Sequence, residues 1–132
     1  MDIPGFSPLQ EPYCVGFFSI EVAQILKNGI SPGDEIYISP SNIEHIRNTH
    51  PDAYLKYFDC IEDILASPDY VGIAGVQLPS YEFIKKFEIQ DEYVNVAVRA
   101  SKRGRFFIRT LFILNDSKMA DYIRKGTLTK LK

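Results

Sequence analysis

The chain has 132 residues, of which 45% are hydrophobic and 24% are charged, and this is the usual balance of one globular domain. The composition excludes a disordered or collagen-like chain, and no apolar run reaches the roughly 18 residues that a membrane span needs. Residues 1–5 show neither the basic nor the apolar region of a signal peptide. The two cysteines, Cys14 and Cys60, favour reduced thiols over a disulfide scaffold. We therefore expect a cytoplasmic protein without membrane contact.

Short helices dominate the first half of the predicted structure. Residues 1–16 contain three prolines and little periodicity, which predicts an irregular arm. Ser19 can cap the first helix, Ser41 and Glu44 have the spacing of a capping box for the second, and Asp59 is placed to cap the last. A proline after His50 predicts a break there. The predicted helices cover residues 19–28, 41–50, 52–58 and 59–67, and one strand covers residues 35–38.

The second half changes to a strand pattern. Two glycines in the first strand predict a bend or bulge, and Ser101–Gly104 reads as a hairpin loop. The predicted strands cover residues 70–76, 83–89, 93–100 and 105–114, and a helix over residues 117–126 turns Met119, Tyr122 and Ile123 inward. Because helices precede an antiparallel sheet, we expect an α+β fold in a single domain over residues 1–132.

Charge is distributed unevenly along the chain, although the formal net charge is only -2. Residues 1–92 contain 5 basic and 15 acidic side chains, whereas residues 93–132 contain 10 basic and 2 acidic ones. The basic segment can make a local positive field that attracts an anionic partner. The alternative is that the two segments pack together and neutralise each other.

An arginine-rich strand face is the clearest candidate binding surface. Strand alternation places Arg105, Phe107 and Arg109 on one side of the last strand. The other side, which looks like the core, then carries Phe106, Ile108, Thr110, Phe112 and Leu114. Pairing through the hairpin places Arg99 near Arg105 and Asn95 near Arg109. Because arginines bind phosphates and aromatic rings stack on unpaired bases, this face suits single-stranded RNA. The candidate nucleic-acid-binding residues are Tyr93, Asn95, Lys102, Arg103, Arg105 and Phe107.

Two histidines, His45 and His50, are the candidate acids or bases near neutral pH. Five helical residues turn by about 140°, so the two side chains do not share a face and make a poor zinc pair. We therefore expect no metal site and no cofactor. The alternative for each histidine is a helix residue that bonds a backbone group.

The segment Ile38–Pro51 resembles the "HI…HP" helix of the phage-type nucleases of the barnase, EndoU, colicin and RelE superfamily. Residues 61–69 are similar to the "IL…PD" segment that follows in that family. A strand with Lys85 and Lys86, a valine-rich strand and a hairpin that ends in residues 109–112 complete the resemblance. It covers residues 35–115 as a nuclease-like core, with an N-terminal arm and helix over residues 1–34 and a helix with a basic tail over residues 116–132.

The resemblance implies a barnase- or RelE-like α+β fold, in which helices pack on one face of a curved antiparallel sheet and the other face receives RNA. It also implies a metal-independent endoribonuclease of a phage, mobile element or toxin system. The matching positions are His45, His50, Arg99, Arg109 and Thr110.

Such cleavage uses the ribose 2′-hydroxyl as nucleophile, so it needs a base, an acid and cations around the phosphate. His45 is the first acid or base candidate and His50 the second. Arg99 and Arg109 would hold the phosphate, with Arg105 assisting. Strand alternation turns Thr110 to the apolar side, so a direct role for Thr110 requires a bulge in its strand.

Two other interpretations fit the same residues. The chain can be a non-catalytic RNA- or protein-binding module that uses the arginine face without a histidine. It can also be an interaction protein whose acidic residues 1–92 contact a basic partner. In a mixed case, an acidic inhibitory or carrier protein covers the arginine face and holds the nuclease inactive.

Overall fold

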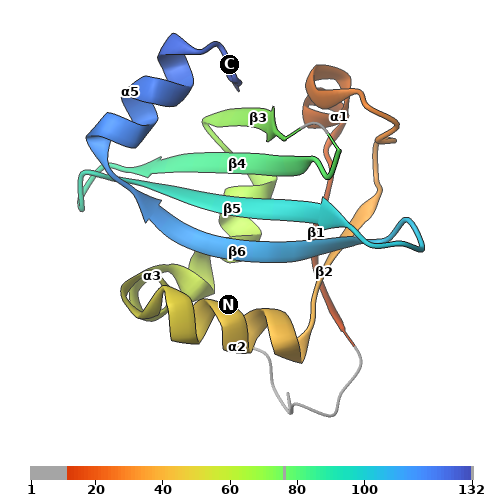
Figure 1. The fold of residues 1–132 in the computed structure, drawn as a ribbon, viewed down its shortest axis with the longest axis horizontal. Coiled ribbons are helices and arrows are strands. Elements are labelled where there is room, and N and C mark those ends of the chain that lie inside the picture. The colour runs from red at the N-terminus through yellow and green to blue at the C-terminus, as the bar shows by residue number, and fades with distance from the viewer. Residues whose placement is uncertain (1–11, 76, 132) are drawn as a thin grey trace.

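A seven-stranded sheet organises the part of the chain that the structure describes, residues 12–75 and 77–131 of a computed structural model (Figure 1). The strands lie in the order β1-β2-β6-β5-β4-β3-β7. They are β1 Tyr13–Phe17, β2 Glu35–Ile38, β3 Tyr70–Ala74, β4 Ser80–Phe87, β5 Glu92–Ala100, β6 Phe106–Leu114 and β7 Leu128–Lys130. The helices are α1 Ile20–Leu26, α2 Pro40–Thr49, α3 Pro51–Tyr57, α4 Ile61–Ala66 and α5 Asp116–Arg124, with a 3-10 turn over Phe58–Cys60.

The mixed α+β class is confirmed, but the expectation of a purely antiparallel sheet is wrong. Strand β2 runs parallel to β6 and pairs with it at only two positions, Ile36 with Phe106 and Tyr37 with Phe107. Helices α2 and α3 contact β6 (Figure 1). This contact matters for function because it places α2 next to the strand that carries the candidate arginine Arg109.

One face of the sheet builds the main hydrophobic core. Buried side chains of β5, Val94, Val96 and Val98, point to this face. Helix α4 packs there with Ile61, Ile64 and Leu65, the three positions that the sequence predicts as its buried side. Each fully buried aliphatic or aromatic side chain contributes roughly 1.5–3 kcal/mol relative to an exposed one, so this layer fixes the frame of the sheet. We call it the core face.

The opposite face, which we call the second face, is the one seen in Figure 1, with α4 behind the sheet. Helix α5 covers part of it, where buried Met119 packs with Ile84 and Leu114. Tyr122 also packs there, but Ile123 is 53% exposed. The prediction that Ile123 turns inward is therefore wrong, because α5 meets the sheet only along its Met119–Tyr122 side.

The start of α2 differs from the prediction. Its N-cap is Ser39, whose side chain accepts from the backbone N–H of Asn42 while the Asn42 side chain accepts from the Ser39 N–H. The predicted capping box of Ser41 and Glu44 is therefore wrong. Pro40 at the first helical position is compatible with this start because it needs no backbone N–H there. The predicted cap of Ser19 on α1 and the break at His50 between α2 and α3 are confirmed.

Three smaller expectations also change. Residues 13–16, predicted as part of an irregular arm, lie in β1, which pairs with β2; residues 1–11 of that arm lie outside the described residues. The N-cap position of α4 is Cys60 rather than the predicted Asp59. Strand β3 pairs with β4 without a register shift, so of the predicted bend or bulge, a bulge is not found in its described residues. Instead, Gly72 lets the Thr127 carbonyl approach, since a Cβ at Gly72 would lie 2.2 Å from that oxygen.

None of the helices in the described ranges is long and apolar enough to cross a membrane.

Candidate active site

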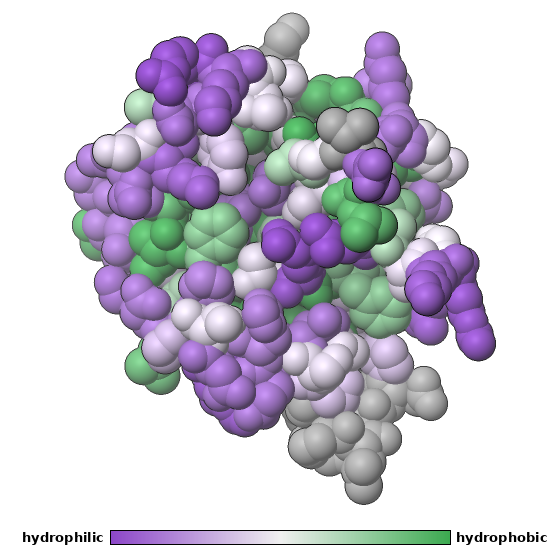
Figure 2. All heavy atoms as spheres, in the orientation of Figure 1, coloured by the Kyte–Doolittle hydropathy of each residue, from purple (hydrophilic) through white to green (hydrophobic). Residues whose placement is uncertain are grey.

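A group of polar side chains occupies the part of the second face next to the α5 contact. It consists of Glu82 from β4, Asn95 and Arg99 from β5, and Arg109 and Thr110 from β6, and we call it the polar cluster. The five residues come together because β4, β5 and β6 are neighbours at the centre of the sheet. Figure 2 shows hydrophilic side chains gathered over the middle of this face, with hydrophobic ones beside them.

A β-bulge in β6 gives the cluster two of its members. Ala97 pairs with Thr110 and the next residue, Val98, pairs with Ile108, so Arg109 is the extra residue. In a bulge of this kind two residues oppose one residue of the partner strand, and Arg109 and Thr110 together face Ala97. A bulge is the condition under which Thr110 could join the arginine face, and the structure meets it.

The observed pairing of β5 with β6 also corrects the predicted faces and neighbours of the hairpin. Beyond the bulge, Phe112 pairs with Asn95 and Leu114 with Tyr93, so residues 110, 112 and 114 turn to the second face rather than to the core. On the loop side of the bulge Arg99 lies opposite Phe107 rather than Arg105, so the hairpin loop itself sets a different register from the predicted one, and beyond the bulge Asn95 lies opposite Phe112 rather than Arg109. One inserted residue reverses the alternation for every residue after it.

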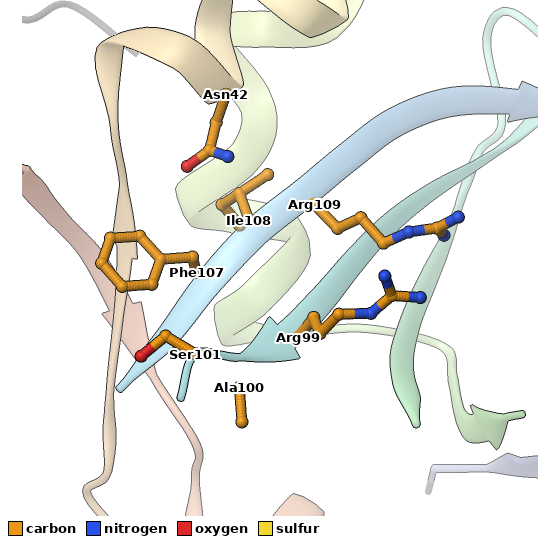
Figure 3. Close-up of a pocket in the computed structure, with 7 residues that line it drawn as sticks. All are labelled: Asn42, Arg99, Ala100, Ser101, Phe107, Ile108 and Arg109. Atoms are coloured by element: carbon orange, nitrogen blue, oxygen red, sulfur yellow. The ribbon is translucent and has the colours of Figure 1, made fainter. Parts of the chain in front are cut away.

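Arg99 and Arg109 present their guanidinium groups together. Figure 3 shows both side chains extending in the same direction along the sheet, away from Phe107 and from Asn42 of α2. Arg109 is exposed, whereas Arg99 is half-buried and its Nε has no hydrogen-bond partner among the described residues. Guanidinium groups offer forked donors that match phosphate oxygens. The pair is therefore suited to an anion with several oxygens.

Glu82 is a nearly buried carboxyl group, with 5% of its surface exposed. Burial raises its pKa, while Asn95, a Ser80 hydroxyl that donates to Oε2 at 3.2 Å, and the charges of Arg109 and Arg99 act in the opposite direction. No ion pair within 4 Å joins Glu82 to either arginine in the described ranges. The carboxylate thus lies within electrostatic reach of both cations without being locked to one, and its raised pKa favours accepting a proton.

Buried polar atoms without partners surround the same carboxyl group. Asn95 is fully buried and neither of its side-chain amide atoms makes a hydrogen bond within the described part of the chain, although the amide lies close enough to Glu82 to lower its pKa. The Thr110 hydroxyl, in a residue that is 6% exposed, is also unpartnered there. Such groups are rare in folded proteins because each costs about 1–3 kcal/mol. Their concentration at one place points to a functional site.

The two candidate histidines belong to α2, which contacts β6: His45 lies within the helix and His50 is its C-cap residue. His50 packs its ring 5.6 Å from that of Phe112, centre to centre, and Phe112 pairs with Asn95. His50 is thus at the rim of the polar cluster. His45 is exposed on α2, and in the described ranges no recorded contact joins its side chain to the cluster.

The other predicted binding residues lie in three separate places. Tyr93 is in the part of the face that α5 covers, beside Tyr70 and beneath the Lys86 ammonium group. Lys102 and Arg103 are exposed in the hairpin loop. Arg105 lies over the Tyr37 ring, 4.2 Å from its centre, and 5.5 Å from the centre of the Phe107 ring. The structure therefore brings Asn95 and Phe107 next to the arginine pair and leaves Tyr93 apart.

Sequence reasoning missed two residues near the site. Glu82 lies between Tyr81 and Phe83, and a single carboxylate inside an apolar strand is a signal that could have found it. Tyr122 of α5 has a pKa raised by burial and by the nearby Glu82 charge, and lowered by Arg109. Its hydroxyl therefore lies within electrostatic reach of both groups.

Within the described ranges, the structure contains no group of three or more histidine, cysteine, aspartate or glutamate side chains that could hold a metal ion. In the polar cluster the two guanidinium groups are the donors suited to an anion.

Comparison with known proteins identifies a family for the chain. No curated protein and no solved structure shows significant similarity to the chain. A family model does match, over residues 14–121, and it is described as "phage-Barnase-EndoU-ColicinE5/D-RelE like nuclease3". The match runs from β1 into α5 and includes every residue of the polar cluster. The chain therefore belongs to the phage-Barnase-EndoU-ColicinE5/D-RelE like nuclease family.

Proposed function

We propose that the chain is a metal-independent endoribonuclease that cleaves RNA by attack of a ribose 2′-hydroxyl on the adjacent phosphate. Membership of the nuclease family supplies the general reaction. The observation that carries the finer proposal is that the nearly buried Glu82 carboxyl lies within electrostatic reach of the half-buried Arg99 and the exposed Arg109. A base and two phosphate-binding cations are the groups that this reaction needs without a metal ion.

Glu82 is the proposed general base. It takes the proton from the 2′-hydroxyl while the 2′-oxygen forms a bond to phosphorus. A carboxylate with a raised pKa is a stronger base than an ordinary one, and burial is the cause of the rise here. Ser80 donates a hydrogen bond to Glu82 Oε2, which holds the carboxylate in position.

Arg99 and Arg109 are the proposed phosphate ligands. Their parallel side chains (Figure 3) allow the two guanidinium groups to contact one phosphate from the same side. As the bond from phosphorus to the 5′-oxygen breaks, charge accumulates on the phosphate oxygens, and fixed cations stabilise that charge. The products are a 2′,3′-cyclic phosphate and a free 5′-hydroxyl.

The leaving 5′-oxygen needs a proton. We assign His50 to this role ahead of His45, because His50 packs on Phe112 at the rim of the polar cluster. Thr110 and Asn95, whose polar atoms are buried, would orient the catalytic groups rather than contact the ribose or the phosphate.

The test is cleavage of a labelled, single-stranded RNA in excess chelator by the protein and its Glu82→Gln variant. Loss of the base should lower kcat by about 10²- to 10⁴-fold, with a 2′,3′-cyclic phosphate on the wild-type product. Glu88→Gln is the matched control, because Glu88 is exposed just beyond the same strand. Equal rates for Glu82→Gln and wild type would remove Glu82 from the mechanism.

The same assay distinguishes the histidines. We expect His50→Ala to lower the rate more than His45→Ala does. RNA that is bound but stays intact with the wild-type protein would contradict the nuclease and favour the binding module.

A further inference from the structure

A hollow of about 230 Å³ lies beside the polar cluster, between the start of α2 and the β5–β6 hairpin (Figure 3). Asn42, Phe107, Arg99 and Arg109 are among the residues that line it. Both arginines point their guanidinium groups away from Asn42 and Phe107, so their alkyl stems face the hollow and their charges lie beyond it. Pockets for drug-sized molecules begin at about 300 Å³, so this one suits a fragment of the size of one ring system.

Phe107 offers this hollow an aromatic surface that is already fixed in place. Its ring centre lies 6.1 Å from that of Tyr37, its partner in the parallel pair of β2 and β6. The Arg105 guanidinium lies over Tyr37 and reaches Phe107 as well. A ring held by such neighbours loses little conformational freedom when a ligand stacks on it.

Asn42 offers the hollow a directed hydrogen-bond donor. Its Oδ1 accepts from the Ser39 backbone N–H at 2.9 Å and from the Ser39 hydroxyl at 2.7 Å. The helix cap therefore occupies the oxygen and fixes the orientation of the amide. The amide nitrogen carries two N–H donors, and Figure 3 shows the side chain directed from α2 towards β6.

We infer that this hollow is the subsite for one unpaired nucleobase of the substrate, an inference that rests on the proposed ribonuclease function. The base stacks on Phe107, and an acceptor on its edge takes an N–H of Asn42. The phosphate of the same strand lies at the guanidinium groups of Arg99 and Arg109. In a duplex the base faces are stacked and the pairing edges are occupied, so the subsite selects single-stranded over double-stranded RNA.

The arrangement favours a base over other ligands of similar size. The hollow combines an aromatic face, a neutral amide donor and cations at one end, and acidic side chains are absent from its described lining. This gradient from apolar to cationic over one pocket matches a nucleotide, which carries its flat ring and its phosphate at opposite ends.

The test uses a short single-stranded RNA in which each nucleotide in turn is replaced by an abasic ribose. With wild-type protein, one abasic position should lower kcat/KM by roughly 5- to 150-fold, the usual contribution of one stacked base. In Phe107→Ala, kcat/KM for the intact RNA divided by kcat/KM for the abasic RNA should fall close to one. Circular dichroism checks that the variant folds. Asn42→Asp keeps an oxygen for the cap but removes both N–H donors, and it should reduce the ratio severalfold.

Ser41→Asp is the matched control for Asn42→Asp. It adds the same charge in the same helical turn, but Ser41 is exposed and does not line the hollow. The ratio of intact to abasic substrate should stay at the wild-type value in this variant.

The outcomes separate the subsite from the nuclease. Two results overturn the subsite while the nuclease stands. One is an equal cleavage rate for intact and abasic RNA at every position. The other is a ratio of kcat/KM for intact over abasic RNA that Phe107→Ala and Asn42→Asp leave unchanged. If wild-type protein does not cleave, fluorescence anisotropy with the same RNAs decides. Tighter binding of the intact RNA, lost in both variants, then supports the subsite and contradicts the nuclease, whereas equal binding overturns the subsite.

Discussion

Glu82 is the residue on which the proposed chemistry depends most. A carboxyl group that is 5% exposed is unusual unless it is paired or functional, and Glu82 has two arginines nearby without a direct ion pair in the described part of the chain. Burial raises its pKa, and the arginine charges partly reverse that rise. The pH dependence of the activity should therefore reflect the pKa of Glu82.

Arg99→Ala should move the acid limb of the pH–rate profile to higher pH. The positive charge of Arg99 lowers the pKa of Glu82, so its removal raises that pKa. The base must be ionised to act, and the ionised fraction then appears only at higher pH. The measurement is kcat/KM for RNA cleavage across pH, which reports the pKa values of the free enzyme.

Arg99→Lys keeps the charge and serves as the control. Its acid limb should stay near that of the wild type even though the rate falls with loss of the forked donor. An acid limb that is identical in Arg99→Ala and wild type would mean that Glu82 is not the base.

At this scale the sequence predicts part of the site. The alternation of β5 identifies Arg99, and the basic hairpin identifies Arg109 as a residue that shares its face. Glu82 escapes prediction because the predicted strand begins at residue 83, whereas β4 begins at Ser80 and therefore includes Glu82. Among 17 acidic residues, the position of Glu82 between Tyr81 and Phe83 could have singled it out, but its place beside the arginines appears only once β4 is set next to β5.

At the scale of elements, the N-terminal cap of α2 stabilises the helix and also positions a residue that lines the hollow. The cap at Ser39 orients Asn42, which lines the hollow beside the polar cluster. The capping-box spacing predicts the helix and the proline after His50 predicts its break, but the spacing of Ser41 and Glu44 points to the wrong cap. Asn42 can act as the third-position partner of Ser39 because its side-chain oxygen accepts from the cap N–H as that of glutamate would.

Ser39→Ala should destabilise the protein by about 1 kcal/mol, within the range of about 0.5–2 kcal/mol for lost N-caps. Ser41 is exposed and is the second residue of α2, so Ser41→Ala should change the free energy of unfolding by less than about 0.5 kcal/mol. Urea denaturation of the two variants measures both values. A larger loss for Ser41→Ala would restore the predicted capping box and contradict the observed one.

The bulge in β6 explains the largest error of the sequence-based description. A strand pattern has a period of two, so one inserted residue reverses the assignment of every later residue. Arg109–Thr110 has no glycine that would signal an irregularity. Strand β7 is missed for a different reason, because its three residues are too few to show a period.

At the scale of the whole molecule, several ion pairs join residues of the same segment, acidic or basic, rather than one segment to the other. Two of the ion pairs in the structure, Lys56 with Glu92 and Lys86 with Asp91, join residues within the acidic segment. Arg124 pairs with Asp121 within the basic segment. The guanidinium groups of Arg99 and Arg109 remain directed along the sheet face (Figure 3). An acidic inhibitory or carrier protein that covers this face stays a prediction of the charge distribution.

The fold as a whole is predicted in class and only partly in topology. The order of helices and strands gives the α+β class, and the family match over residues 14–121 agrees with the resemblance. The parallel pairing of β2 with β6 rests on two residue pairs, and no local pattern in so short a strand shows its direction. A barnase- or RelE-like arrangement remains what the resemblance implies for this seven-stranded sheet.

The most direct test of the proposed reaction compares RNA and DNA of the same single-stranded sequence in excess chelator. Attack by the 2′-hydroxyl requires a ribose, so we expect the RNA to be cut and to carry a 2′,3′-cyclic phosphate, while the DNA stays intact. Cleavage of the DNA, or cleavage of the RNA that stops when divalent ions are chelated, would contradict a metal-independent ribonuclease at the polar cluster.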